Sequence, residues 1–444
     1  MPVDPAESPC SLTIMSLPPE TMLNIFDYLH VGHKVTTDRT TKHYTSFALF
    51  PFSIALVCSH WRDIIAQKSE YWSSVVIMLD FSFDSSVMMT CLEAFTQLET
   101  IKLHLVSYDE VEVEPSAENA LFGAFVRILA PFFHKCKTIS VDVQYRSTIV
   151  AAARILDGLI APDLDDLYLV SRVTDSTEDI PFTSLNCPKL KYVSMDAKSF
   201  VGFANANAQL ETRIERNHDF GRVLSVFPYH PETESPKLTR SALISAITHF
   251  IDSYGPLEYL LIEDVRFDQL DFDVPEAITA GGNYVHLFDL DARFLSAFFA
   301  NFDPPEAEGD EGILSLTRCE LDFPIAVPFM ATLMLRDIDD THTVLHALKF
   351  WDGLIVDVSN CAGFTDGVLD AMARERLCGE VVSLTVRDCP VSVAGVRGFV
   401  ASRRQDETFQ CLDVSGAPPL SSEDKEWFRE RVFDEVLWNK EEIR

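Results

Sequence analysis

Two short stretches near the N-terminus space their apolar residues as an α-helix does. In residues 18–30 the two prolines suit a helix start, and one apolar stripe follows at i, i+3, i+4 and i+7, formed by Met22, Ile25, Phe26 and Leu29. Residues 52–67 show the same helical spacing of apolar residues, with Ile54, Val57, Cys58, Trp61 and Ile65 on one stripe. We predict two amphipathic helices whose apolar faces need a partner.

A polar, threonine-rich stretch separates these two helices and predicts a loop at about residues 31–50. After the second helix, Ser69 can cap a turn that ends at Trp72, and residues 75–81 have the character of a buried strand. We therefore expect a flexible N-terminus over residues 1–15 and a small helical module over residues 16–74.

The C-terminal part of the chain repeats itself with a fixed period. Val358, Val386 and Val414 occupy equivalent positions, since 386 − 358 = 28 and 414 − 386 = 28, and Cys361 and Cys389 share that register. Each unit reads as a short alternating strand, a turn and a helix. The equivalent cysteines are expected to pack inward at the ends of their strands.

A weaker form of the same strand pattern, L-x-x-L-x-L, recurs upstream. It is found at 98/101/103, 164/167/169, 190/193/195, 257/260/262 and 330/333/335. The last positions of the third and fourth units, Met195 and Ile262, are 67 residues apart (262 − 195), and residues 205–237 are interpreted as an insertion. At the far end, Ser421-x-x-Asp424 predicts the start of a helix carrying Phe428, Val432 and Val436, which would cap the repeats.

These patterns predict an α/β protein in which residues 75–444 form an irregular solenoid, with a parallel sheet on its concave face and helices outside. Alternate strand residues point to opposite faces of a sheet, so stacking aligns the outward ones into an extended protein-binding surface. The outward candidates for target binding are Tyr168, Glu263, Arg336, Asp357, Arg387 and Asp413.

The N-terminal residues resemble an F-box. The motif positions are carried by Leu17, Pro18, Glu20, Ile25, Phe26, Leu29, Leu56, Val57, Cys58, Trp61 and Arg62, with Trp72 as the later tryptophan. The connection at 31–50 is longer than the usual link of the family. The resemblance implies that the helices bind a Skp-type adaptor, which joins the chain to a cullin-RING ubiquitin ligase. The implied contacts are Leu17, Pro18, Ile25, Phe26, Leu29, Leu56, Val57 and Trp61.

The repeats are similar to cysteine-containing leucine-rich repeats. In the unit at 356–368 the motif is carried by Val356, Val358, Cys361, Phe364, Thr365, Asp366 and Val368. Later units depart from it, because Val393-Ala394 replaces Thr-Asp and Ala417 replaces the cysteine. Together the two resemblances imply the substrate-recognition subunit of an SCF-type ligase, which holds an unidentified target protein and has no catalytic residues of its own.

Charge and cysteine content narrow the classes of partner. With 68 acidic and 36 basic residues the net charge is −32, which repels nucleic acid and anionic membrane surfaces and favours a target of basic character. The ten cysteines show no CxxC pair and no dense spacing, so we expect free thiols in the cytoplasm or the nucleus. The longest apolar run is too short to span a membrane.

The sequence lacks the usual catalytic and cofactor motifs. We find no G-x-S-x-G, H-E-x-x-H, phosphate loop or G-x-G-x-x-G, and the histidines form no spaced metal-ligand cluster; His30, His33 and His43 are interpreted as solvated. No cofactor or metal is therefore expected. Two alternatives stay open, namely a scaffold that binds the adaptor outside ubiquitination and an enzyme with a pocket among the irregular repeats.

Overall fold

The strand-forming units of the chain lie side by side in a single sheet. The computed structural model describes Ile14 and residues 17–32, 50–79, 85–107, 113–208, 221–233, 235–268, 282–302, 312–324, 330–403 and 409–443. The strands of this part are β1(Ser74–Met78), β2(Ile101–Val106), β3(Cys136–Tyr145), β4(Asp166–Val173), β5(Tyr192–Asp196), β6(Arg222–Phe227), β7(Leu257–Glu263), β8(Gly282–Phe288), β9(Ile313–Thr317), β10(Thr332–Arg336), β11(Ile355–Ser359), β12(Ser383–Arg387), β13(Cys411–Ser415), β14(Glu435–Trp438) and β15(Glu441–Glu442).

Each strand pairs with the next one along the chain. The described strands run in the order β1 to β15, all parallel except the last pair. The pairing is in register, so that Leu333 lies beside Val356 and Leu335 beside Val358. The predicted α/β class with a long, mostly parallel sheet is confirmed, and the consecutive order gives it the form of a solenoid.

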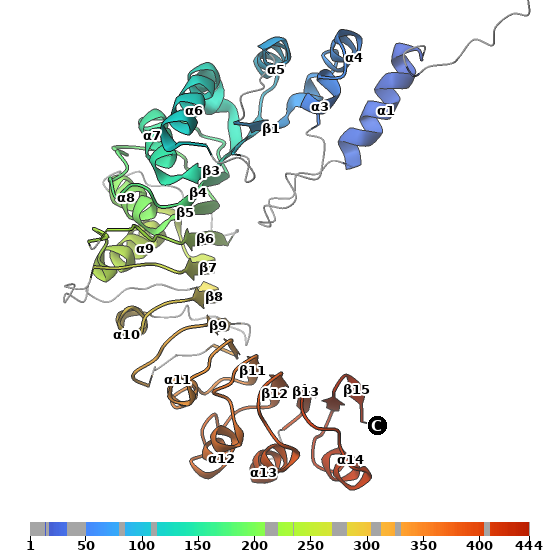
Figure 1. Cartoon of the computed structure of the whole chain (residues 1–444), viewed down its shortest axis with the longest axis vertical. Helices are drawn as coiled ribbons and strands as arrows, with labels where there is room; N and C mark the ends of the chain where they lie inside the picture. Colours follow the sequence, from blue (N-terminus) through green and yellow to red (C-terminus); the bar gives the residue numbers. More distant parts are fainter. Residues whose placement is uncertain are drawn as a thin grey trace, which may run out of the picture.

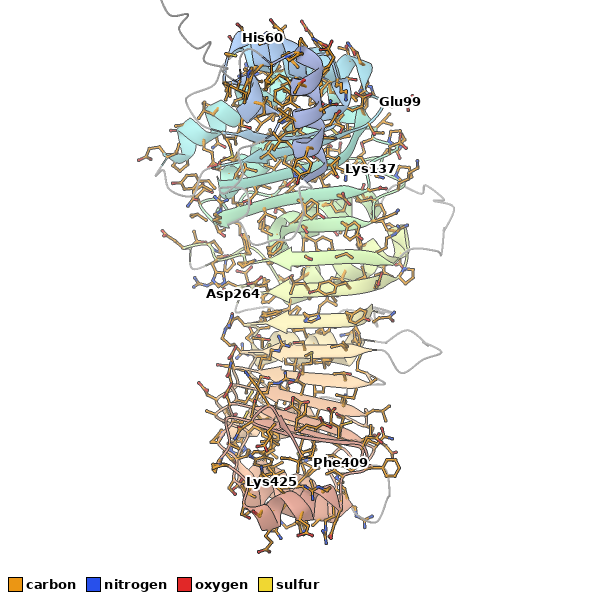
Figure 2. The ribbon with its side chains drawn as sticks, turned by 90° about the vertical axis from the view of Figure 1, so that its right-hand side faces the viewer. His60, Glu99, Lys137, Asp264, Phe409 and Lys425 are labelled. Atoms are coloured by element: carbon orange, nitrogen blue, oxygen red, sulfur yellow. The ribbon has the colours of Figure 1, made fainter. Side chains whose placement is uncertain are left out.

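Helices return the chain from one strand to the next, and they cover one face of the sheet. They are α5(Ser85–Gln97), α6(Pro115–Leu129), α7(Arg146–Leu156), α8(Ala197–Ala208), α9(Arg240–Tyr254), α10(Ala292–Asn301), α11(Thr341–Leu348), α12(Asp366–Arg374), α13(Val393–Arg403) and α14(Ser422–Arg429), with a 3-10 turn η3(Ala130–Lys135). Figure 1 shows the sheet along the inner side of an arc and these helices along the outer side. We call the face turned away from the helices the inner face; Figure 2 views it with the strands side by side.

Alternation along each strand separates the core from the inner face. Leu333 and Leu335 point toward the helices and are fully buried, as are Val356 and Val358 on the next strand. The residues between them lie on the inner face. Cys361 and Cys389 are also buried, as predicted, and burial raises the pKa of the Cys361 thiol to about 11.

Most strands in the C-terminal half are followed by one residue in the left-handed conformation. Asp264, Asp289, Asp337, Asn360 and Asp388 have φ between 48° and 55°. In each case the N–H donates to the carbonyl of the last residue of the next strand. Asp and Asn tolerate this conformation better than other residues with a Cβ. This turn leads the chain out of the sheet toward the helix layer.

Four strands were missed by the sequence pattern for one shared reason. The L-x-x-L-x-L pattern begins with a large aliphatic residue. In the repeats that contain β3, β6, β8 and β9, this first position is instead Cys136, Gly221, Gly282 and Glu311, respectively. The segment interpreted as an insertion, residues 205–237, is therefore wrong in part, because it contains β6 and the end of α8. Its residues 209–220 lie outside the described part.

The C-terminal cap differs from the single helix predicted. The capping box at Ser421 and Asp424 is present, but α14 ends at Arg429. Val436 belongs to β14, which turns through Asn439 and Lys440, both at positive φ, into the short antiparallel β15. The hairpin, with Glu441 and Glu442 outermost, closes an edge that would otherwise pair with another chain.

The N-terminal module consists of α1(Pro19–Gly32), α3(Phe52–Ala55), α4(Ser59–Ile65) and the 3-10 turn η2(Ser69–Trp72). The single helix predicted at 52–67 is broken, because Cys58 is extended and its Sγ accepts from the N–H of Trp61 as the cap of α4. Trp72 is fully buried and lies edge-on to Phe52 at 5.4 Å. Most of the predicted loop at 31–50, and residues 1–15 apart from Ile14, lie outside the described residues.

A buried ion pair joins the repeats in the first half of the sheet. Arg146, at the start of α7, and Asp196, at the end of β5, are almost completely buried and lie 3.0 Å apart. The guanidinium also donates to the carbonyls of Ser176 and Glu178 and to the Ser199 hydroxyl. The long connection between β4 and β5 is thus fixed to the core.

Among the helices of the described residues, none has both the length and the apolar character that a membrane span requires.

We expect Arg146→Ala to lower the free energy of unfolding by about 3–5 kcal/mol, because it leaves the Asp196 carboxylate buried without its counter-charge. Urea denaturation followed by fluorescence measures the change. Arg374→Ala is the control: its pair with Asp370 is exposed, so the loss should stay below about 0.5 kcal/mol. Equal losses for the two variants would contradict the role given to Arg146.

Candidate interaction surfaces

The N-terminal module exposes large apolar side chains. Ile25 and Leu29, one helical turn apart on α1, are 38% and 41% exposed, and Leu56 and Val57, in the break between α3 and α4, are 56% and 55% exposed. Tyr28 and Val31 on α1 are more exposed still. The break explains the second pair, since a continuous helix would carry Val57 on the same stripe as the half-buried Trp61.

The other residues expected to contact an adaptor divide between surface and core. Pro18 is exposed and Leu17 half-buried against the core. Phe26 is only 1% exposed and packs on the half-buried Trp61, with ring centroids 5.6 Å apart. The expectation that Phe26 is an adaptor contact is therefore corrected: it belongs to the core of the module.

A polar and aromatic cluster attaches α1 to the rest of the module. The Asp27 carboxylate accepts from the Lys68 ammonium at 2.7 Å and from the Tyr71 hydroxyl at 2.5 Å. The Lys68 hydrogen bond is the main cause that lowers the pKa of Asp27. His30 packs on Phe50 and Tyr71, so it is not simply solvated as predicted; His33 and His43 lie outside the described residues.

The predicted target-binding residues all lie on the inner face, in two rows across the sheet. Strand register places Tyr168, Asp357 and Asp413 in a middle row and Glu263, Arg336 and Arg387 in a row two residues later along each strand. β4 and β13 are nine strands apart, which is roughly 43 Å at the usual strand spacing. These residues therefore share a face but do not form one compact site.

At the C-terminal end of the sheet the predicted residues pair with one another. Arg387 lies 3.3 Å from the carboxylate of Asp357 on the strand before it and 3.2 Å from that of Asp413 on the strand after it. Arg318 pairs in the same manner with Asp289. A partner would have to replace these ion pairs, which makes this region less suited to binding than its exposed charges imply.

The middle of the inner face carries aromatic residues that the sequence reasoning missed. One register row consists of Tyr192, Val223, Tyr259, Tyr284 and Ile313, from β5 to β9, and none of the five is fully buried. In the row that lies two residues after the middle row along each strand, Phe227 and Phe288 are also half-buried. The signal was available: each tyrosine stands directly before the second apolar position of its repeat.

His286 occupies the centre of this aromatic region. Its ring is stacked on that of Tyr259, with centroids 5.0 Å apart and planes 27° from parallel. Burial, and then the positive charge of Arg336, lower the pKa of His286, so the ring is neutral at physiological pH. It extends the aromatic surface without adding charge.

Within the described residues, no group of three or more His, Cys, Asp or Glu side chains is arranged to hold a metal ion. Burial also raises the thiol pKa of the core cysteines, to about 12 for Cys319 and Cys378. These thiols are poor nucleophiles at neutral pH.

A scan against models of protein families finds no match for this chain, and a search of curated proteins finds none.

We expect the stability gained from Asp27 to depend on pH. A carboxyl whose pKa is lower in the folded protein stabilises it above the unfolded pKa of about 4 and loses this effect as the pH falls through the folded value. Relative to Asp27→Asn, the wild type should be more stable by about 1 kcal/mol or less at neutral pH, because Asp27 is 42% exposed.

Urea midpoints of both proteins at a series of pH values measure this difference. The advantage should be constant above about pH 5 and shrink below about pH 4. An advantage that persists unchanged, or grows, at the acid end would show that the contacts of Asp27 do not depend on its charge.

Proposed function

We propose that this chain is the substrate-recognition subunit of an SCF-type ubiquitin ligase. The observation that carries the proposal is the exposure of Ile25, Leu29, Leu56 and Val57 on a small N-terminal helical module, while Phe26 and Trp72 of the same module are buried in the core. Two of these residues lie on the Ile-Phe-x-x-Leu stretch and two on the Leu-Val-Cys-x-x-Trp-Arg stretch that resemble an F-box. A Skp-type adaptor is the partner that this resemblance implies.

The energetics favour a partner at these four residues. Full burial of an exposed Leu, Ile or Val side chain contributes roughly 1.5–3 kcal/mol, and each of the four is between 38% and 56% exposed. Burying the rest of them under a partner would gain several kcal/mol before the costs of association. Singly exposed apolar residues are common, but four on one short module are characteristic of an interface.

The arrangement of the two surfaces supports a role that works by proximity. Both views show α1 at the N-terminal end of the sheet, on the side toward which the inner face is turned (Figures 1 and 2). A target on the inner face and an adaptor on α1 would lie on the same side of the chain. Holding two partners close raises the effective concentration of one at the other, and the transfer of ubiquitin itself would be performed by other subunits.

The adaptor contact is tested by co-purification with a Skp-type adaptor. We expect the wild type to form a stoichiometric complex and the double variant Ile25→Asp, Val57→Asp to lose it by at least about a hundredfold in affinity, because two charges would be buried at the interface. Circular dichroism verifies that the variant is folded.

The matched control is Phe433→Asp, which places the same charge on an apolar side chain that is 81% exposed at the opposite end of the sheet. It should bind the adaptor as the wild type does. A folded wild type that does not bind the adaptor would overturn the proposal. Ubiquitin attached to a co-purifying protein would distinguish a ligase subunit from a scaffold that uses the same adaptor.

A further inference from the structure

The inner face of β8, β9 and β10 carries a single charged residue. Each of these strands contributes three positions to the face, and the register aligns them in rows. The nine residues are Tyr284, His286, Phe288, Ile313, Ser315, Thr317, Thr332, Met334 and Arg336. None of them is Asp or Glu, and His286 is neutral at physiological pH because its pKa is lowered. We call these nine residues the Arg336 surface.

The Arg336 side chain is exposed, and it forms no hydrogen bond or ion pair with another residue that the structure describes. The neighbouring carboxylates are already engaged elsewhere. Asp357, on the next strand, pairs with Arg387, and Asp337, the next residue along the chain, lies 3.8 Å from Arg318. The guanidinium is therefore not neutralised by the carboxylates beside it.

The repeat does not require a charge at this position. The residues in the same register row on the neighbouring strands are neutral, namely Phe288, Thr317 and Ser359. The charge of Arg336 nevertheless acts across the surface, because it is the second cause, after burial, that lowers the pKa of His286. A positive field over a surface without carboxylates favours an anion.

A buried hydroxyl without a partner lies directly beside Arg336. Thr317 is the register neighbour of Arg336 on β9. Its side chain is 3% exposed, and its Oγ1 has no hydrogen-bond partner among the described residues. A buried polar group without a hydrogen bond costs free energy and is rare in folded proteins. Thr317 and Arg336 therefore lack the same kind of partner, a hydrogen-bond acceptor.

We infer that the Arg336 surface binds a carboxylate of a partner protein, on a segment in which this carboxylate stands alone among apolar residues. A guanidinium pairs with a carboxylate in two parallel hydrogen bonds, and the Thr317 hydroxyl can donate a third. Phe288 and Met334, both half-buried on the same surface, would cover the apolar neighbours of the carboxylate. The inference rests on the proposed function, since it names the chemistry by which the subunit would hold its target.

Two features favour a single carboxylate over a phosphate or a run of acidic residues. Arg318 and Arg387, the other arginines at the ends of these strands, already form ion pairs, so one guanidinium without a partner matches one negative charge. The chain as a whole carries a net charge of −32, which repels a segment with several negative charges. A target of basic overall character can still present one carboxylate at the contact.

The test measures the fluorescence anisotropy of rhodamine-labelled peptides with the full chain. The probe is a short apolar peptide with one central glutamate and an amidated C-terminus, and its matched control has glutamine at that position. We expect the glutamate peptide to bind at least about tenfold more tightly than this carboxylate-free control. The glutamine peptide with a free C-terminus distinguishes a terminal carboxylate from a side-chain carboxylate, and tighter binding of either one supports the inference.

A charge-removing variant locates the binding on the chain. Arg336→Gln should lower the affinity for the carboxylate peptide by at least about tenfold, to the level of the carboxylate-free control. The matched variant is Arg374→Gln on α12, which makes the same change of net charge at an exposed arginine of the helix layer. It should leave the affinity unchanged.

Thr317→Val tests the hydroxyl, since it keeps the shape of the side chain. We expect the affinity for the carboxylate peptide to fall by about threefold to tenfold, while the free energy of unfolding stays equal or rises because a buried hydroxyl without a partner is removed. Urea denaturation measures the free energy of unfolding. A loss of stability together with unchanged affinity would show that the hydroxyl serves the fold and not the ligand.

Three results would overturn the inference. The first is that neither carboxylate peptide binds more tightly than the carboxylate-free control up to about 1 mM peptide. The second is an equal loss of affinity in Arg336→Gln and Arg374→Gln, and the third is tighter binding of a phosphoserine peptide than of the glutamate peptide. Arg336→Gln should bind the adaptor as the wild type does, because that contact is proposed on α1 and on the break after α3, so the two proposals fail separately.

Discussion

In-register stacking of parallel strands is the constraint on which the rest of this structure depends. Each repeat has to bury two apolar residues, such as Leu384 and Val386. They lie beside the equivalent pair of the neighbouring repeat, Val356 and Val358. Because side chains alternate along a strand, this burial turns the residue between them onto the inner face. The position of every surface residue in the sheet is therefore a consequence of how its neighbours are buried.

The two ends of the sheet show how a solenoid is closed. At the start, the helical module covers the first strand, with Trp72 and Ile65 in the continuous core. At the end, β15 folds back on β14 and leaves glutamates outermost. Terminal repeats need such caps because an open strand edge pairs readily with other chains. At the N-terminus the capping element also carries the exposed apolar residues, so one element serves stability and the proposed adaptor contact.

The inner face has two regions with different physical character. Toward the C-terminus, Arg387 is held between Asp357 and Asp413, and these charges are satisfied by one another. In the middle, the register row of Tyr192, Tyr259 and Tyr284 is aromatic and only partly buried. Charged groups that already form ion pairs change their free energy little when a partner binds. Half-exposed aromatic rings, in contrast, gain favourable free energy from further burial. The middle region is therefore the better candidate for recognition.

The sequence by itself determined the local elements. The period of 28 residues, the buried cysteines and the capping box at Ser421 follow from periodicity and local hydrogen bonding, which involve residues close in the chain. The same reasoning failed where a repeat begins with Cys136 or Gly221, since one weak position obscures a short pattern.

Only the tertiary structure decided which apolar residues are core and which are surface. Phe26 and Ile25 are neighbours on one predicted stripe, yet Phe26 is buried on Trp61 and Ile25 is exposed. The tyrosine row likewise joins residues from β5 to β8 that are distant in the chain. Burial and alignment depend on elements far apart in sequence, and the periodicity of a single segment carries no information about them.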